Sequence, residues 1–452
     1  MSAPTVRPGV AEPSPWTFPA VEDGPLSNGA RLCTIHVPGQ YIASVRAVVT
    51  GPLAAEPTDL EGVATLVSRT LDEGTRRRSG EEFAAAMERH GAHYGAWVFD
   101  ASAQVGVDVA IGRLGPALEL MAEALTDPVF PADEVARHVA LRIAEIDQDH
   151  ADPGSLAAET FARYALDDAS RLSRPVGGSA ETVRGLDPAA ARAWYDAAYG
   201  NDRLSLVVAG DLTGLDVHAL ADAALGGWST DAGPAAAVTA PGSGSRPRLV
   251  VVDRPGSVQT ELVIGSIGPD RSDPAWSEHV LAARMVGGTL TSRLDAVLRE
   301  EKGYTYGFRA AFTPFSTGGL FSAHGSVRTE VTGPALADAL AILARAREGF
   351  TDTELEDARQ YLTRMAPMRY ETSVDIASQV AANIGNGVGV DFVDRHQAGL
   401  AAASGDGVTA AWVGSVEPAR LVVVAVGDAS GIESQLADLD LTPYGLTEPV
   451  RG

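Results

Sequence analysis

The sequence has little cysteine, no long apolar run and no targeting pattern at its start. It contains one cysteine, Cys33, which excludes an internal disulfide and any zinc site built from cysteines. In "NGARLCTIHV" Cys33 lies in a strand-like segment, so we expect a small core residue. No run of about 18 apolar residues occurs, which argues against a membrane-spanning helix. Residues 1–24 show neither a secretory signal nor a lipidation motif, so we expect a cytoplasmic protein with a Pro-rich, loosely held tail.

Positive charge is also scarce. The formal net charge is -24 and Lys302 is the single lysine. Nucleic acid and anionic membrane are therefore excluded as partners, because binding to phosphate needs a basic surface that this chain lacks. Basic or neutral peptides are tolerated better. The hydrophobic and charged fractions, 45% and 21%, are ordinary for a globular protein, and 452 residues indicate two or more domains.

Two segments of the chain share the same sequence pattern. "RLSLVVAGDL" near residue 204 and "RLVVVAVGDA" near residue 421 are apolar strand-like runs that end in Gly-Asp, and Asp428 follows Asp211 by 217 residues. An Ala-Trp pair in a helix-like stretch precedes each run, with Trp412 218 residues after Trp194. We infer an internal repeat of two homologous domains.

The rest of each half fits this repeat. Residues 114–146 and 332–365 both read as an amphipathic helix, a short break and a second helix, and each half also contains extended segments. Residues 229–246 have the Ala, Pro, Gly and Ser composition of a linker, which sets the predicted domains at 1–228 and 247–452. We expect two α+β domains, each a mostly antiparallel sheet covered by helices, that form a clam-shell cleft.

Several motifs together resemble the M16 family of zinc peptidases, in particular its short insulinase-like and mitochondrial-processing-peptidase-like members. They include the Gly-Thr after the first helix, "GAHYGAWVFDASAQV" and the two Gly-Asp strands. The most specific is "GGTLTSRLDAVLREEKGYTYG" in the second half. The resemblance covers residues 16 to 440 and implies the fold described above.

In active members of this family a helix carries His-x-x-Glu-His ten residues ahead of the Thr of Gly-Thr. The two histidines bind zinc and the glutamate activates water. In "EGVATLVSRTLDEGT", which we predict to be a helix with a glycine stop at Gly74, counting back from Thr75 assigns these roles to Thr65, Ser68 and Arg69. None of the three can perform them, because a hydroxyl is a poor zinc ligand and Arg69 is a permanent cation.

The family's third zinc ligand is a glutamate on a later helix, and Glu145, 76 residues after Arg69, stands at about that separation. Two interpretations remain open: Glu145 is a solvated helix carboxylate, or it forms a salt bridge with Arg69 in the vacated pocket. We predict no metal in this chain under either interpretation.

The second half keeps the features that the resemblance associates with substrate. In active members an Arg and a Tyr seven residues apart reach the peptide at the zinc, and Arg299 and Tyr306 have that spacing. We expect Arg299 at a helix end, a left-handed stop at Gly303 and Tyr306 on the following strand. A guanidinium and a phenol are suitable donors to a peptide carbonyl and its developing oxyanion. A packing role for both residues is the alternative.

The missing zinc motif and the Arg/Tyr pair together resemble the non-catalytic subunit of bacterial M16 heterodimers. The resemblance implies a homologous partner that carries His-x-x-Glu-His and zinc, and an extended peptide as substrate. The glycine pair Gly287 and Gly288 resembles a shortened substrate-binding loop, with a tight turn between helices as the alternative. A second hypothesis is a structural homologue that holds peptides along residues 94 to 107 without contributing to catalysis. The sequence leaves open whether the isolated chain forms a homodimer.

Overall fold

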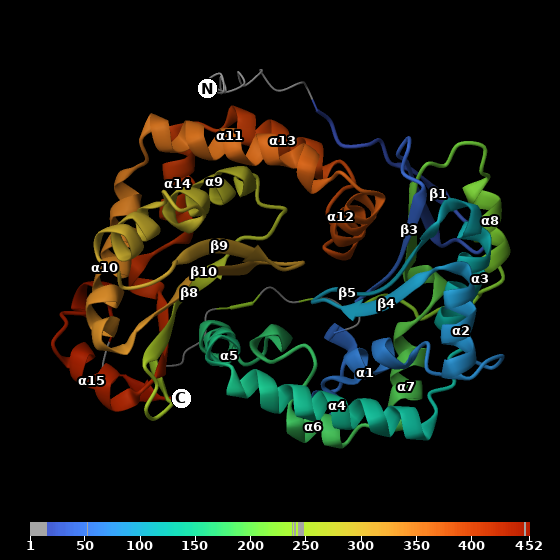
Figure 1. Cartoon of the computed structure of the whole chain (residues 1–452), viewed down its shortest axis with the longest axis horizontal. Coiled ribbons are helices and arrows are strands. Elements are labelled where there is room, and N and C mark those ends of the chain that lie inside the picture. Colours follow the sequence, from blue (N-terminus) through green and yellow to red (C-terminus); the bar gives the residue numbers. More distant parts are fainter. Residues whose placement is uncertain (1–15, 52, 237, 239–240, 243–247, 447–448) are drawn as a thin grey trace, which may run out of the picture.

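The computed structural model describes residues 16–51, 53–236, 238, 241–242, 248–446 and 449–452. These residues form two six-stranded sheets, one in each half of the chain (Figure 1). The predicted linker, residues 229–246, and the predicted N-terminal tail lie in part outside the described residues.

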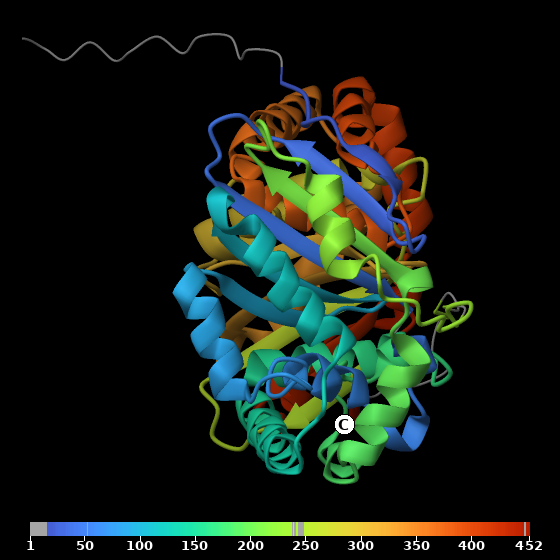
Figure 2. The same ribbon diagram turned by 90° about the vertical axis from the view of Figure 1, so that its right-hand side faces the viewer.

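The first sheet has the strand order β1-β2-β6-β3-β5-β4, and all its neighbours are antiparallel except β2 and β6. Its strands are β1 (Glu22–Pro25), β2 (Arg31–His36), β3 (Ile42–Thr50), β4 (His93–Val98), β5 (Ser102–Ala110) and β6 (Leu204–Gly210). The helices of this half are α1 (Val63–Thr70), α2 (Gly80–His90), α3 (Leu114–Thr126), α4 (Ala132–Ala151), α5 (Pro153–Ala165), α6 (Ala180–Arg184), α7 (Pro188–Ala198) and α8 (Val217–Leu225). In Figure 2, α3 (teal) and α8 (light green) lie in front of the blue strands.

The second sheet has the order β12-β7-β11-β8-β10-β9, in which β7-β11-β8-β10-β9 repeats the order β2-β6-β3-β5-β4 of the first. Its strands are β7 (Leu249–Asp253), β8 (Gln259–Gly268), β9 (Arg309–Pro314), β10 (Gly319–Arg328), β11 (Val422–Gly427) and β12 (Val450–Arg451). The helices are α9 (Trp276–Gly287), the π-helix η6 (Asp295–Glu301), α10 (Thr332–Arg345), α11 (Asp352–Arg369), α12 (Ser373–Gly385), α13 (Phe392–Ala402), α14 (Gly405–Ser415) and α15 (Ala429–Ala437). The predicted α+β fold with two similar halves is confirmed.

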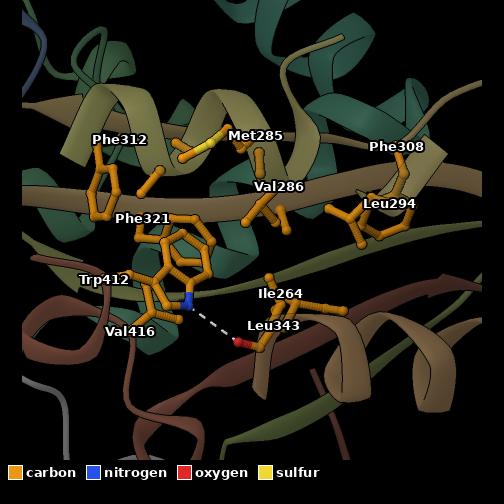
Figure 3. Packing of buried hydrophobic residues seen from close by; sticks show 14 of the residues in the cluster. Ile264, Met285, Val286, Leu294, Phe308, Phe312, Phe321, Leu343, Trp412 and Val416 are labelled. Carbon is orange, nitrogen blue, oxygen red and sulfur yellow. Dashed lines mark hydrogen bonds between the residues drawn. The ribbon is translucent and has the colours of Figure 1, made fainter. Parts of the chain in front are cut away.

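The repeat extends to single contacts. Asp211 accepts a hydrogen bond from the backbone N–H of Gly39 at 2.9 Å, and Asp428 accepts the same bond from Gly256 at 2.8 Å. Each Asp, directly after β6 or β11, therefore ties the end of that strand to the loop that follows its parallel neighbour, β2 or β7. The two tryptophans differ: Trp412 donates to the carbonyl of Leu343 at 3.2 Å (Figure 3), whereas the buried indole N–H of Trp194 has no partner among the described residues.

One helix of each half packs on the sheet of the other half. Helix α12 packs on β3 and β6 of the first sheet, and α5 packs on β8 and β11 of the second (Figure 1). This exchange explains why all seven residues of β6 are buried, since helices cover both of its faces. Cys33 on β2 lies in the same core as α12 with no exposed surface, and burial raises the pKa of its thiol.

Candidate functional site

Helix α1, in which the sequence analysis predicts a degenerate zinc site, is held at its start by a buried carboxylate. Gly62 precedes the helix with a φ of 101°, a left-handed conformation that favours glycine. One oxygen of Glu56 accepts hydrogen bonds from the backbone N–H groups of Gly62, at 3.1 Å, and Ala64, at 2.8 Å. Arg171 donates to the other oxygen at 2.9 Å. The first turn of α1 is thereby capped and fixed in place.

A second ion pair supports the same region. Both oxygens of Glu61 accept hydrogen bonds from Nε of Arg174 at 2.9 Å. Gly178 packs against this segment so closely that a Cβ there would lie 2.1 Å from the carbonyl oxygen of Glu61. Residues 177–178 thus form one wall beside the helix that the sequence marks as a former metal helix.

The structure ends α1 at Thr70, so the predicted glycine stop at Gly74 is wrong. Gly74 instead lies in an isolated β-bridge with Ser79, and a Cβ there would come within 2.8 Å of Cγ of Pro131. Close packing against the loop before α4 accounts for the glycine at this position, so a Gly-Thr pair after a helix does not mark the helix end here.

Thr65, Ser68 and Arg69 lie on α1 and line one small cavity of about 290 Å³. Glu145, on α4, accepts two hydrogen bonds from Nη1 of Arg69, at 2.9 and 2.8 Å, and Arg142 adds one at 3.1 Å. Burial opposes ionisation of Glu145, but the hydrogen bonds from the two guanidiniums outweigh it and lower its pKa below the usual value. Of the two interpretations left open by the sequence, the structure has the salt bridge.

This donor set does not fit zinc. The Thr65 hydroxyl faces the carbonyl of Val176 at 3.5 Å, and the charge of Arg69 stands beside the single carboxylate of the group. Zinc needs deprotonated nitrogen, sulfur or carboxylate ligands, of which only Glu145 remains here. The residues at these positions therefore do not make a zinc site.

A different trio of metal-ligating side chains does occur among the described residues: Glu73, Glu134 and His138. Arg137 hydrogen-bonds to both carboxylates, with 2.6 Å to Glu134, and His138 lies 2.7 Å from Glu73. The guanidinium already supplies the positive charge that a metal would bring. This trio, which the sequence analysis did not single out, is therefore best described as an ion-pair cluster.

The cavity beside α1 is walled by β4, which is the edge strand of the first sheet. Trp97 is 44% exposed, and its ring lies over Gly95 and Gly106, where a Cβ would meet the ring at 2.7 and 2.8 Å. The two glycines are register partners on β4 and β5, so their missing side chains create the seat for the indole. The exposed side chain of Trp97 thus lies on β4, the strand that has no further neighbour on its outer side in the sheet.

A second cavity of about 520 Å³ lies at the junction of the two halves, as the clam-shell expectation requires. Trp97 and Asp100 line it from the first half, and Arg271 and Pro314 from the second. The loops meet here, since Asp100 accepts a hydrogen bond from the backbone N–H of Ser316 at 2.6 Å.

Arg299 lies in the π-helix η6, and Gly303 follows with a left-handed φ of 63°, as the sequence suggested. π-Helical segments are rare in proteins, and those that occur are often found at functional sites. Nε of Arg299 lies 3.5 Å from the neighbouring Glu300. Tyr306 is not on the predicted strand: it lies three residues before β9, and 92% of its surface is exposed.

The loop that carries Tyr306 is fixed at both sides. Asp295, fully buried, accepts hydrogen bonds from the backbone N–H of Phe308 at 2.7 Å and from Arg309 at 2.6 Å. The Thr305 hydroxyl and Gly307 exchange hydrogen bonds of 2.9 and 3.0 Å around Tyr306. The phenol therefore projects outward from a structured turn. Asp295 was missed by the sequence analysis, and a lone acid in an apolar helix pattern is the signal that could have found it.

The structure does not bring the two predicted sets together. No hydrogen bond or ion pair found among the described residues joins Arg299 or Tyr306 to Thr65, Ser68, Arg69 or Glu145. Helix α1 lies against β4 in the first half, whereas Tyr306 precedes β9 in the second (Figure 1).

Gly287 and Gly288 lie where α9 ends. Gly287 is buried, and a Cβ there would lie 2.5 Å from the backbone nitrogen of Ala310 on β9. A Cβ on Gly288 would lie 2.7 Å from Cα of Arg284. Close helix–strand packing thus accounts for Gly287, whereas Gly288 lies against the last turn of its own helix. A role in contacting substrate stays a prediction for both. Among the described residues no helix is long and apolar enough to cross a membrane.

Comparison with known proteins places both sets of residues in family models. The model "Insulinase (Peptidase family M16)" matches residues 31–170, and the model "Peptidase M16 inactive domain" matches residues 185–362. The first range contains Thr65, Ser68, Arg69 and Glu145, and the second contains Arg299 and Tyr306.

Relatives agree with this assignment. An uncharacterized zinc protease of Streptomyces coelicolor is 27% identical over 67% of this chain and 67% of its own length, and one of Mycobacterium tuberculosis is 27% identical over 73% and 75%. Among solved structures, a peptidase M16 inactive domain from Pseudomonas fluorescens covers 90% of this chain and 98% of its own, with a TM-score of 0.83 at 24% identity. A protease from Helicobacter pylori covers 91% and 100%, with a TM-score of 0.83 at 14% identity. The two family models together match more than half of the chain, which therefore belongs to the M16 peptidase family.

Proposed function

We propose that this chain is the non-catalytic, substrate-binding subunit of a cytoplasmic two-chain M16 zinc metallopeptidase. A homologous subunit with His-x-x-Glu-His would hold the zinc, and this chain would supply Arg299 and Tyr306 to the peptide bound there. The observation that carries the proposal is Tyr306, a phenol 92% exposed on a turn that hydrogen bonds hold in place. A large side chain presented in this way has no packing role within its own chain.

The chemistry of the pair suits peptide hydrolysis. A guanidinium and a phenol both donate hydrogen bonds, and donors aimed at the oxygen on which negative charge develops lower the barrier to hydrolysis. The loss of zinc ligands at Thr65, Ser68 and Arg69 complements this pair, since each chain would bring what the other lacks. The names of the relatives, zinc proteases, support the reaction class.

The test uses this chain mixed with its zinc-bearing homologue. Tyr306→Phe and Arg299→Ala are expected to lower peptide turnover of the complex by about 100- to 1000-fold, the effect of losing one oxyanion donor. The matched control is Tyr41→Phe, which removes a hydroxyl from a residue 72% exposed in the first half and should change turnover less than about twofold, roughly 0.4 kcal/mol.

If Tyr306→Phe leaves turnover within about twofold while the two chains still assemble, the catalytic contribution is refuted. That result would favour the alternative, in which the protein binds extended peptides along the free edge of β4 and takes no part in catalysis. Elemental analysis provides a separate check. We expect no stoichiometric zinc in the purified chain and no hydrolysis by the chain alone, and about one zinc per chain with chelator-sensitive proteolysis would contradict this.

A further inference from the structure

Two arginines line the cavity beside α1, although the protein as a whole is strongly acidic. Arg69 and Arg142 both line it, whereas Glu145 and Asp149, the acids bound to these arginines, do not. Both guanidiniums are ion-paired with these acids, and neither acid lines the cavity itself. A carboxylate ligand inside would therefore share the two guanidiniums with Glu145 and Asp149.

Unused hydrogen-bond donors line the same cavity. Ser68 is 2% exposed, and its hydroxyl has no hydrogen-bond partner among the described residues. A buried hydroxyl without a partner is costly unless a ligand or water satisfies it. Arg69 uses only Nη1 in its described hydrogen bonds, so Nη2 and Nε remain free to donate. The Thr65 hydroxyl, at 3.5 Å from its acceptor, is weakly bound.

The cavity opens beside a strand that can accept a peptide. Ala96 to Phe99, at the end of β4, form one wall, and β4 has no neighbour on its outer side in the sheet. An edge strand offers backbone N–H and C=O groups for pairing with an extended peptide. Trp97, on β4, and Phe99, directly after it, are 44% and 47% exposed and add apolar contact area there. A peptide paired with β4 would bring one of its ends to the cavity.

We propose that this cavity binds the free C-terminal carboxylate of an extended peptide laid along β4, with Ser68, Arg69 and Arg142 as the recognising donors. Carboxylate oxygens accept hydrogen bonds from guanidinium and hydroxyl groups, and such charge-assisted bonds are the strong ones. The volume of about 290 Å³ exceeds the roughly 10–15 Å³ that a single water needs, so there is room for more than solvent. The replacement of zinc ligands by donors converts a cation site into an anion site.

The site would hold peptides by their ends and is independent of Arg299 and Tyr306, which lie in the other half. Its test therefore needs no partner chain. A fluorescein-labelled peptide of about ten alternating threonines and valines is made with a free C-terminal carboxylate and again with a C-terminal amide. Fluorescence anisotropy with the full chain measures both affinities. We expect the carboxylate peptide to bind about tenfold tighter or more.

Variants assign that preference to the cavity. Arg69→Met and Ser68→Ala are expected to remove most of it, whereas Glu145→Gln, which releases Arg69 from its competing acid, is expected to tighten carboxylate binding about threefold. Arg89→Met, an exposed arginine on α2, is the matched loss of one positive charge and should preserve the preference. Ser68→Ala leaves the Arg69–Glu145 pair intact, so it tests the site even if Arg69→Met unfolds.

The proposal is overturned if the two peptides bind equally or not at all, or if Arg89→Met abolishes the preference as fully as Arg69→Met. A competition experiment with sodium acetate, against sodium chloride at the same ionic strength, tells whether the cavity binds any small carboxylate or only the carboxylate of a peptide. Displacement of the peptide by low millimolar acetate would mean that the cavity takes any small carboxylate and does not need a peptide on β4, which also overturns the proposal as stated.

Discussion

The buried ion pair at the start of α1 predicts a large and pH-dependent loss of stability when one partner is removed. Glu56 has no exposed side-chain surface, and Arg171, 13% exposed, approaches it to 2.8 Å. Arg171→Met leaves a buried carboxylate with only its two backbone donors. Breaking a buried pair in this way costs about 3–5 kcal/mol. Urea unfolding at pH 7.5, followed by circular dichroism, measures this loss.

The pH dependence distinguishes lost charge compensation from lost packing. Burial raises the pKa of Glu56 above its usual value even though Arg171 opposes this, so without Arg171 the pKa rises further. A raised folded-state pKa means that the folded protein binds the proton more tightly than the unfolded chain does, so stability is gained as pH falls through that pKa. The deficit of Arg171→Met should therefore shrink at pH 5.

The control is Arg395→Met, which breaks an ion pair with Asp391 whose side chains are 58% and 63% exposed. Such surface pairs contribute about 0–1 kcal/mol. If Arg171→Met costs no more than Arg395→Met at pH 7.5, or if its deficit is the same at both pH values, then Glu56 is not held as an ionised buried acid and the account of α1 given above is wrong.

Two more stability predictions follow. Burial, more than any nearby charge, raises the pKa of Asp72 to about 6, so the folded state loses stability as pH rises from about 4 to 6. Asp72→Asn should therefore raise the free energy of unfolding by up to about 3 kcal/mol at pH 8 and leave it unchanged at pH 3.5. Urea titrations at the two pH values measure this difference. Gly287→Ala should lower the free energy of unfolding by about 1–3 kcal/mol, because the new methyl group overpacks against Ala310. Gly414→Ala on α14, where a Cβ meets nothing within 4 Å, should raise it by about 0.5–1 kcal/mol. Equal effects of the two substitutions would refute the packing argument.

The parts of the fold that the sequence predicts are those encoded by local patterns. The Gly-Asp strands and the paired Ala-Trp helices mark the repeat, and the structure places Asp211 and Asp428 in the same contact. Helices α3 and α4, and α10 and α11, follow from the 3.6-residue periodicity of their segments. The salt bridge between Arg69 and Glu145 is one of two interpretations that the sequence leaves open, and the structure decides for it.

What the sequence does not predict depends on contacts between distant segments. Gly74 looks like a helix stop, but its missing side chain serves contact with Pro131, 57 residues away. The turn around Tyr306 is stabilised by Asp295: its place in an apolar helix pattern marks it as unusual, but its partners Phe308 and Arg309 are set by the fold. The exchange of α5 and α12 has no local signature at all, because an amphipathic helix does not specify which sheet it covers.

That exchange decides how a peptide can reach the site. Separating the two halves would expose the apolar faces of α5 and α12, including Phe161, Ile376, Val380 and Ile384, all buried in the cores of the two sheets. At about 1.5–3 kcal/mol for each buried side chain, the cost is roughly 6–12 kcal/mol, comparable with the 5–15 kcal/mol that stabilises a typical domain. Opening of the two halves would therefore be costly in the isolated chain. The edge of β4 and the phenol of Tyr306 are already exposed, so a ligand can reach both without such opening.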